Sequence, residues 1–160
     1  MKDRYSHTVR NENLIARLLL TRSHYDNRKD KGWVLWIDLE NLYFKNLLND
    51  IRIYLPPGKK SLTNEMKTYE RQDLYIHGEE EIMDFIKKIE NILSYDKEKS
   101  CSTTVKMYDC SILDISVYPK NPVYKQVKFH HYGNNHELIM VFDRISLMEM
   151  HEFLKSIDLS

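Results

Sequence analysis

The chain has 160 residues and a mass of 19.3 kDa, which is the size of one ordinary domain. Its 42% hydrophobic content is typical of a globular protein, and equal numbers of basic and acidic residues, 24 of each, disfavour a generally basic nucleic-acid binder. No run of apolar residues approaches the length of about 20 that a bilayer span needs. We therefore expect a soluble, cytoplasmic protein without a membrane partner.

Residues with GC-rich codons are scarce in this chain. Ala occurs once, at Ala16, and there are only 4 Gly and 4 Pro, whereas Lys, Asn, Ile and Tyr are abundant. This composition indicates an AT-rich genome, and we interpret the source as a low-GC bacterium or one of its phages. Cys101 and Cys110 are too few to build a disulfide framework, so we expect both to be reduced.

The first third of the chain predicts a long hairpin. Two apolar segments, Leu14 to Leu20 and Trp33 to Ile37, flank a polar tip that ends at Gly32. Trp, Val and Ile favour a strand after the tip. The segment over 14–24 fits either a strand or a helix, and we adopt the strand.

Helical periodicity is clearest in the middle of the chain. Apolar residues recur every three or four positions from Ile82 to Leu93. Glutamates fill positions 79–81, where the helix dipole favours negative charge. The pattern predicts a helix over residues 79–94.

A second amphipathic helix is predicted at the C-terminus. The same apolar spacing runs from Leu147 to Ile157. Ser146 is the expected N-cap, with Glu149 as its partner in a capping box.

A strand, a tight turn and a helix occur in the same order over 74–93 and 140–158. In this alignment Phe85 corresponds to Phe153, at an offset of 68 residues. A weak internal duplication is one interpretation, and the frequent pairing of strand and helix in small α+β domains is the one that we favour. No linker divides residues 1–160, so we treat them as a single domain.

Short alternating stretches between the helices predict antiparallel strands. Residues 113–117 alternate apolar and polar side chains, and two further apolar stretches flank a turn at 133–135. The expected fold class is α+β, a single domain with a mainly antiparallel β-sheet and two or three amphipathic helices packed on one face.

The segment Ile37-Asp38-Leu39-Glu40-Asn41 ends an apolar strand, and it resembles the opening motif of NYN/PIN-like nucleases. The resemblance implies a magnesium ion held by Asp38, with Asn41 as a partner in the site. Such a nuclease needs further carboxylates at the ends of parallel strands, and the sequence places none there. We therefore expect no catalytic residues and keep a metal-dependent nuclease as the alternative.

Other signatures of cofactor or metal chemistry are missing from the sequence. His130 and His131 are adjacent, so on a strand they point to opposite faces and cannot share one ion without a bulge. The four glycines are too dispersed for a phosphate-binding loop of the common types. We expect neither a metal nor a cofactor.

Two surfaces are candidates for binding a partner. The first is the hairpin tip with Arg28, Lys29 and Lys31, in a region, residues 1–32, that holds eight basic and four acidic residues. Such a basic tip suits phosphate or an acidic protein surface. The second is one face of the strand near 123–132, which carries Tyr124, Lys128, His130 and Tyr132. Exposed tyrosines suit a protein interface or stacked bases.

These features favour a non-enzymatic protein that binds another protein and inhibits or modulates it. An anti-CRISPR-like or other anti-defence protein of a phage or mobile element fits this profile, as does an immunity protein for a bacterial toxin. The alternatives are an NYN/PIN-like nuclease and a single-strand nucleic-acid-binding protein. The expected partner is a protein, such as a bacterial defence effector or toxin, with nucleic acid second.

Overall fold

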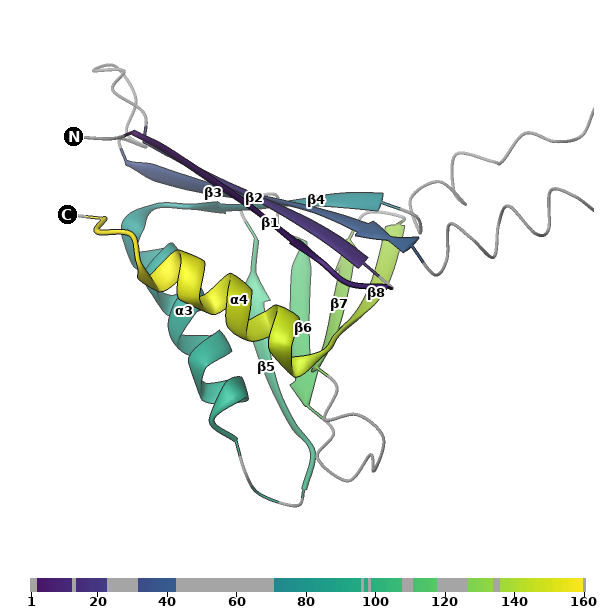
Figure 1. Ribbon diagram of the computed structural model, residues 1–160. Coiled ribbons are helices and arrows are strands. Elements are labelled where there is room, and N and C mark those ends of the chain that lie inside the picture. The colour runs from purple at the N-terminus through teal and green to yellow at the C-terminus, as the bar shows by residue number, and fades with distance from the viewer. Residues whose placement is uncertain are drawn as a thin grey trace, which may run out of the picture.

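Four strands and a helix, followed by four more strands and a second helix, make up the part of the chain that the structure describes (Figure 1). This computed structural model describes residues 3–12, 14–22, 32–42, 71–95, 97, 99–107, 111–117, 127–133 and 136–159. The elements are β1 (Arg4–Arg10), β2 (Leu14–Arg22), β3 (Trp33–Asn41), β4 (Arg71–His77), α3 (Glu79–Leu93), β5 (Cys101–Lys106), β6 (Ile112–Val117), β7 (Val127–Gly133), β8 (His136–Phe142) and α4 (Arg144–Lys155). No helix among these residues is long and apolar enough to cross a bilayer.

The strands form two antiparallel sheets, which we call sheet A and sheet B. Sheet A has the order β1-β2-β3-β4 and sheet B the order β5-β6-β7-β8. In Figure 1 the strands of sheet A run across the view, and those of sheet B run down it. The expected α+β class, mainly antiparallel with amphipathic helices, is confirmed. The division into two sheets is new, because alternation predicts strands without showing which of them pair.

The predicted hairpin is confirmed as β2 and β3. Its register runs from Arg22 opposite Trp33 to Leu14 opposite Asn41, so the described part of the ambiguous segment, residues 14–22, is a strand. Leu18 and Leu20 are buried on the face that packs against the helices. The residues at alternate positions of β2 face the other way, and two of them, Ile15 and Leu19, are also apolar. A strand with apolar residues on both faces reads as a continuous apolar run, which explains why a helix fitted the sequence equally well.

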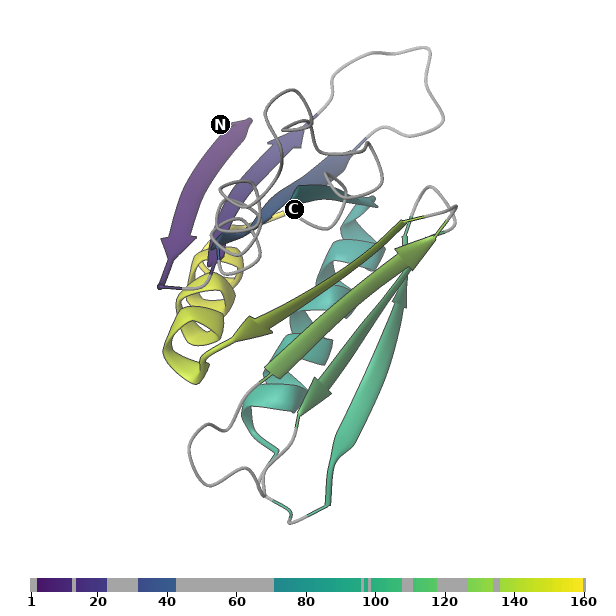
Figure 2. The same ribbon diagram turned by 90° about the vertical axis from the view of Figure 1, so that its right-hand side faces the viewer.

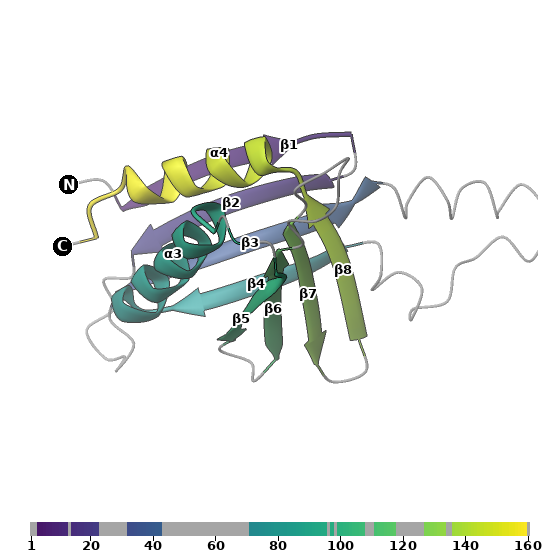
Figure 3. The same ribbon diagram turned by 90° about the horizontal axis from the view of Figure 1, so that it is seen from below.

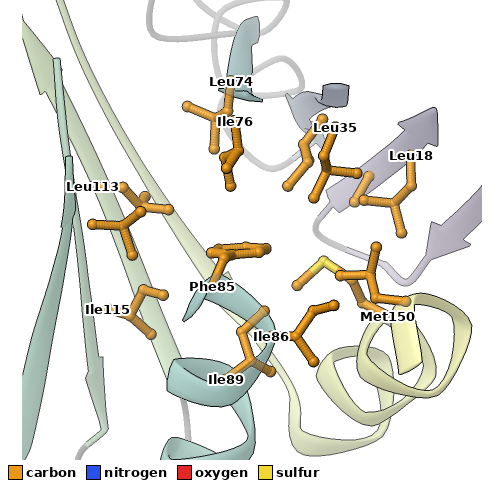
Figure 4. Close-up of a cluster of buried hydrophobic side chains, with 14 of the residues drawn as sticks. Leu18, Leu35, Leu74, Ile76, Phe85, Ile86, Ile89, Leu113, Ile115 and Met150 are labelled. Carbon is orange, nitrogen blue, oxygen red and sulfur yellow. The ribbon is translucent and has the colours of Figure 1, made fainter. Parts of the chain in front are cut away.

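The core lies where α3 meets both sheets. The predicted helix over 79–94 is confirmed, and its buried side chains are those of the predicted face, Ile82, Phe85, Ile86, Ile89 and Ile92. Helix α3 contacts β3 and β4 of sheet A as well as β5 and β6 of sheet B. Figure 4 shows the Phe85 ring with Ile76 and Leu74 of sheet A on one side, and Leu113 and Ile115 of sheet B on another. One helix face therefore closes the space between the two sheets.

The C-terminal helix begins earlier than expected. Asp143, and not Ser146, is the N-cap of α4, because its side chain accepts a hydrogen bond of 2.7 Å from the backbone N–H of Ser146. Asn11 donates to the same Asp143 carboxylate at 2.8 Å and fixes it in place. Glu149 does not complete a capping box, and instead lies 2.9 Å from His7 Nε2 of β1.

The two helices are offset by fewer residues than the sequence alignment assumed. Gly78 and Asp143, the N-cap residues of α3 and α4, are 65 positions apart rather than 68. Phe85 therefore matches Met150, and both are fully buried. Phe153, which the sequence alignment matched to Phe85, is partly buried and stacks on the His7 ring.

Candidate binding face on sheet A

Sheet A has one face turned away from the helices. Both helices and sheet B lie on its other side (Figures 1 and 3), and no element of the described part of the chain covers it. We call it the outer face. From β2, β3 and β4 it comprises Ile15, Arg17, Leu19, Thr21, Val34, Trp36, Asp38, Glu40, Arg71, Asp73, Tyr75 and His77.

An aromatic pair lies in the middle of the outer face. Trp36 is directly opposite Tyr75 in the register of β3 and β4. Their ring centroids are 6.4 Å apart, and the ring planes lie within 10° of parallel. Tyr75 is 42% exposed, which is high for so large an apolar group on a sheet. Asp73 accepts a hydrogen bond of 3.0 Å from Trp36 Nε1 and so restrains the indole.

The charge environment keeps the Tyr75 phenol protonated. Partial burial, followed by the negative charges of Asp73 and Asp38, raises the pKa of Tyr75 above its ordinary value of 10.0. The pair therefore presents two neutral aromatic rings at any physiological pH.

Two arginines converge on Asp38 beside the aromatic pair. Arg71 donates to Asp38 Oδ1 from Nε at 2.8 Å, and to Oδ2 from Nη2. Arg17 donates from Nη1 to Asp38 Oδ2 at 3.3 Å and to Glu40 Oε2 at 3.1 Å. The hydrogen bond to Asp38 is the main cause of a raised pKa at Arg71, so this guanidinium stays charged.

The two signs of charge lie at different depths in this cluster. The side chains of Asp38 and Glu40 are 1% and 10% exposed, whereas those of Arg17 and Arg71 are 42% and 55% exposed. A ligand approaching the sheet therefore meets the guanidinium groups first. The carboxylates beneath them hold the guanidinium groups in place.

The structure gives Asp38 a different setting from the one that the NYN/PIN resemblance implies. Strand β3 is antiparallel to both of its neighbours, whereas the resemblance implies a parallel sheet. Both carboxylate oxygens of Asp38 accept hydrogen bonds from arginines. No group of three or more potential metal ligands occurs among the residues that the structure describes. Asn41 is the last residue of β3, opposite Leu14.

The first predicted partner surface cannot be placed. All three of its residues, Arg28, Lys29 and Lys31, lie outside the described residues, as does Tyr124 of the second surface. They stay predictions.

The remaining predicted residues lie on β7, the third strand of sheet B (Figure 2). The register sets Lys128, His130 and Tyr132 opposite Ser116, Asp114 and Ile112 of β6. Those β6 residues alternate with the buried Leu113, Ile115 and Val117. The role of Lys128, His130 and Tyr132 in binding stays a prediction.

Sequence reasoning missed the outer face of sheet A. The alternation of side chains along β3 could have indicated this face. Leu35 and Ile37 belong to the core, so Trp36 between them must point away from it. Arg71 gave no such signal. It follows Asp38 by more than thirty positions, and only the pairing of β3 with β4 brings the two together.

Comparison with known proteins gives little. No protein-family model matches the chain, and no curated protein matches it. One similar solved structure is the crystal structure of WHY1 from Arabidopsis thaliana, with a TM-score of 0.47 and 9% sequence identity, over 98% of this chain and 89% of that one. Similarity at this level supports no inference about the function of this chain.

Proposed function

We propose that the protein binds single-stranded nucleic acid on the outer face of sheet A. The observation that carries the proposal is the nearly parallel Trp36–Tyr75 pair, with Tyr75 exposed and Trp36 partly exposed, beside the guanidinium groups of Arg17 and Arg71. Aromatic rings that stack on bases and cations that contact the backbone are the two recurring parts of such sites.

The aromatic pair suits unpaired bases in particular. Stacking of one base on an aromatic side chain contributes about 1–3 kcal/mol, as judged by alanine substitution, and it tolerates any base. Double-stranded nucleic acid keeps its bases stacked on each other, so it cannot use Trp36 and Tyr75 in this way. We therefore expect a preference for single strands and little dependence on sequence.

The zero net charge of the chain is compatible with this proposal, because the local balance decides phosphate contact. Strand β1 adds exposed Arg4 and Arg10, which pair with outer-face positions of β2. Together with Arg17 and Arg71, they place four guanidinium groups along this face. Asp73, which is also exposed, is engaged by the Trp36 indole.

Tryptophan fluorescence tests the proposal directly. The chain has two tryptophans, and Trp33 is buried at 2% exposure, so Trp36 should report contact at the outer face. Titration with oligothymidylate of about 16 nucleotides should quench the emission to saturation, with lower affinity at higher salt. A hairpin duplex of the same length should bind more weakly.

Matched variants complete this test. Measured with a fluorescein-labelled oligonucleotide, Trp36→Ala and Tyr75→Ala should each lower the affinity about tenfold, within the range of one lost stacking contact. Met83→Ala, an exposed change on α3, should leave it unchanged. Absence of binding by the unmodified protein, or equal loss in all three variants, would refute the proposal.

A second candidate is the protein-binding modulator expected from the sequence. Apolar side chains on the helices favour it, since Met83, Ile145 and Met148 are 53%, 79% and 40% exposed. These residues are on the other side of sheet A from the aromatic pair. Anti-CRISPR-like, other anti-defence and immunity functions stay predictions within this candidate. Capture of a host protein that survives Trp36→Ala and is lost with Ile145→Glu would favour it over nucleic-acid binding.

A further inference from the structure

Two arginines from different strands meet at one oxygen atom on the outer face. Arg17 Nη1 and Arg71 Nη2 both donate to Asp38 Oδ2. We propose that these two guanidinium groups form a subsite for a single phosphate of the bound strand, next to the Trp36–Tyr75 pair. This inference rests on the proposed function. It adds where one phosphate of the strand lies and that both arginines contact this same phosphate.

Unused donors make the subsite capable of binding an anion. A guanidinium has five N–H donors in a fixed fork. Arg71 uses two of them on Asp38, and Arg17 directs Nη1 to Asp38 and Glu40. No other partner of these two guanidinium groups occurs among the described residues. Their remaining donors are available to the oxygens of a phosphate. A phosphate can reach them because the side chains of Arg17 and Arg71 are 42% and 55% exposed.

The shared carboxylate makes the two arginines act together. Because both groups are bound to the same Asp38 oxygen, they are close enough for one phosphate to bridge them. Asp38 is 1% exposed, so it anchors the pair from below. Holding a long side chain in advance reduces the entropy that binding would otherwise cost. The planar guanidinium of an arginine can donate two parallel hydrogen bonds to two oxygens of one phosphate, which the ammonium group of a lysine cannot do.

The position beside the rings connects the subsite to base stacking. Asp38 and Trp36 are two residues apart on β3, which is about 7 Å along a strand. They point to the same face because the side-chain period of a strand is two. A nucleotide that stacks its base on the rings can therefore direct its backbone toward Arg17 and Arg71.

If the cluster of Arg17, Arg71, Asp38 and Glu40 has only a structural role, a different result is expected. If Arg17 and Arg71 only neutralise Asp38 and Glu40, their loss changes the stability of the fold and leaves the salt dependence of binding as it was. Phosphate contacts, in contrast, set the slope of log affinity against log salt, at about 0.7 for each phosphate of a single strand. The slope therefore separates the two roles.

The experiment measures that slope for the full chain with fluorescein-labelled oligothymidylate, over about 50–200 mM salt. Arg17→Gln, Arg71→Gln and the double variant are compared with the unmodified protein. For a shared phosphate, each single variant keeps one contact and loses about tenfold in affinity, and the double variant lowers the slope by about 0.7 in total. Arg144→Gln, an exposed change at the start of α4, should leave the slope unchanged.

Removal of Arg71 leaves a buried carboxylate with one partner, so folding needs its own control. The comparison is repeated in an Asp38→Asn background, where replacing the arginines leaves no charged carboxylate at position 38, and circular dichroism checks each variant. The same decrease of about 0.7 in the slope is expected between Asp38→Asn and its triple variant with both arginines replaced.

Two results would overturn the subsite. A decrease of about 1.4 in the double variant would mean that the arginines contact two separate phosphates, and an unchanged slope would mean that they contact none. In both cases the unmodified protein still binds the oligonucleotide, so the proposed function stands. If the unmodified protein does not bind and Trp36 is not quenched, the proposed function itself fails.

Discussion

Trp36 Nε1 donates a hydrogen bond of 3.0 Å to Oδ1 of Asp73 on the neighbouring strand. The bond crosses from β3 to β4 diagonally, since Trp36 is directly opposite Tyr75 and Asp73 is two residues before it. One carboxylate thus restrains the indole and also lies near the phenol of Tyr75. The orientation of one ring and the ionisation of the other therefore depend on the same side chain.

The first prediction concerns the titration of Tyr75. Asp73→Asn keeps an acceptor for Trp36 and removes a negative charge, so the pKa of Tyr75 should fall toward its ordinary value of 10.0 while remaining above it because burial persists. Absorbance of tyrosinate in an alkaline titration measures this pKa, with Tyr75→Phe identifying the residue. An unchanged curve would mean that Asp73 has no effect on Tyr75.

Stability at alkaline pH follows from the same shift. A pKa raised in the folded state stabilises the fold below the unfolded value near 10.0, and this contribution is lost as pH rises through the folded value. Tyr75→Phe should therefore lose less stability than the unmodified protein between about pH 9 and pH 11. Urea midpoints at the two pH values provide the comparison.

The second prediction concerns the cap of α4. Asp143→Ala removes the acceptor for the Ser146 N–H and for Asn11, and should cost about 0.5–2 kcal/mol of unfolding free energy. Asp143→Asn keeps an acceptor and should cost less. Urea unfolding at neutral pH measures both. A larger loss for Ser146→Ala than for Asp143→Ala would restore the capping role that the sequence assigned to Ser146.

Local patterns predicted the local elements of this fold. The alternation in β2 and β3 and the helical period of α3 depend on neighbouring residues only, and both predictions are confirmed. The prediction of Ser146 as the N-cap of α4 was wrong, because Asp and Ser are equally good N-cap residues and both Asp143 and Ser146 occur there. Asn11 helps to settle the choice through a hydrogen bond that spans 132 positions.

The candidate binding face required contacts that no local pattern contains. The sequence could indicate that Trp36 points away from the core, by parity with Leu35 and Ile37. It could not indicate that Tyr75 lies opposite Trp36 or that Arg71 reaches Asp38, because both depend on the register of β3 with β4. The tyrosine-bearing surface predicted from the sequence therefore lies on sheet B, where the role of Tyr132 stays a prediction.

The third prediction concerns the core between the two sheets. Phe85 is 0% exposed and packs against both sheets, so Phe85→Ala should cost about 3–5 kcal/mol of unfolding free energy. Met83→Ala, on the exposed side of the same helix, should change it by no more than about 0.5 kcal/mol. A cost below about 1 kcal/mol for Phe85→Ala would show that the face of α3 is wrongly assigned.

The last prediction concerns catalysis at Asp38. Both of its oxygens are occupied by Arg17 and Arg71, and the carboxylate is 1% exposed. A magnesium ion would have to displace two charged donors from a buried group, and it would find only Glu40 as a carboxylate neighbour on the same strand. Incubation of the pure protein with magnesium or manganese and with single- or double-stranded RNA or DNA should give no cleavage.

Two variants make this negative result informative. Asp38→Asn should leave the nucleic acids intact, as the unmodified protein does, and should reduce stability because two arginines lose their charged partner. Asp73→Asn serves as the control, since Asp73 is exposed on the same face and binds neither arginine through any hydrogen bond of the described residues. Cleavage that requires the metal, disappears with Asp38→Asn and persists with Asp73→Asn would establish the nuclease in place of the binding protein. That outcome would also require the arginines to move away from Asp38 in the active form, because their positive charges lie beside both carboxylate oxygens and repel a cation.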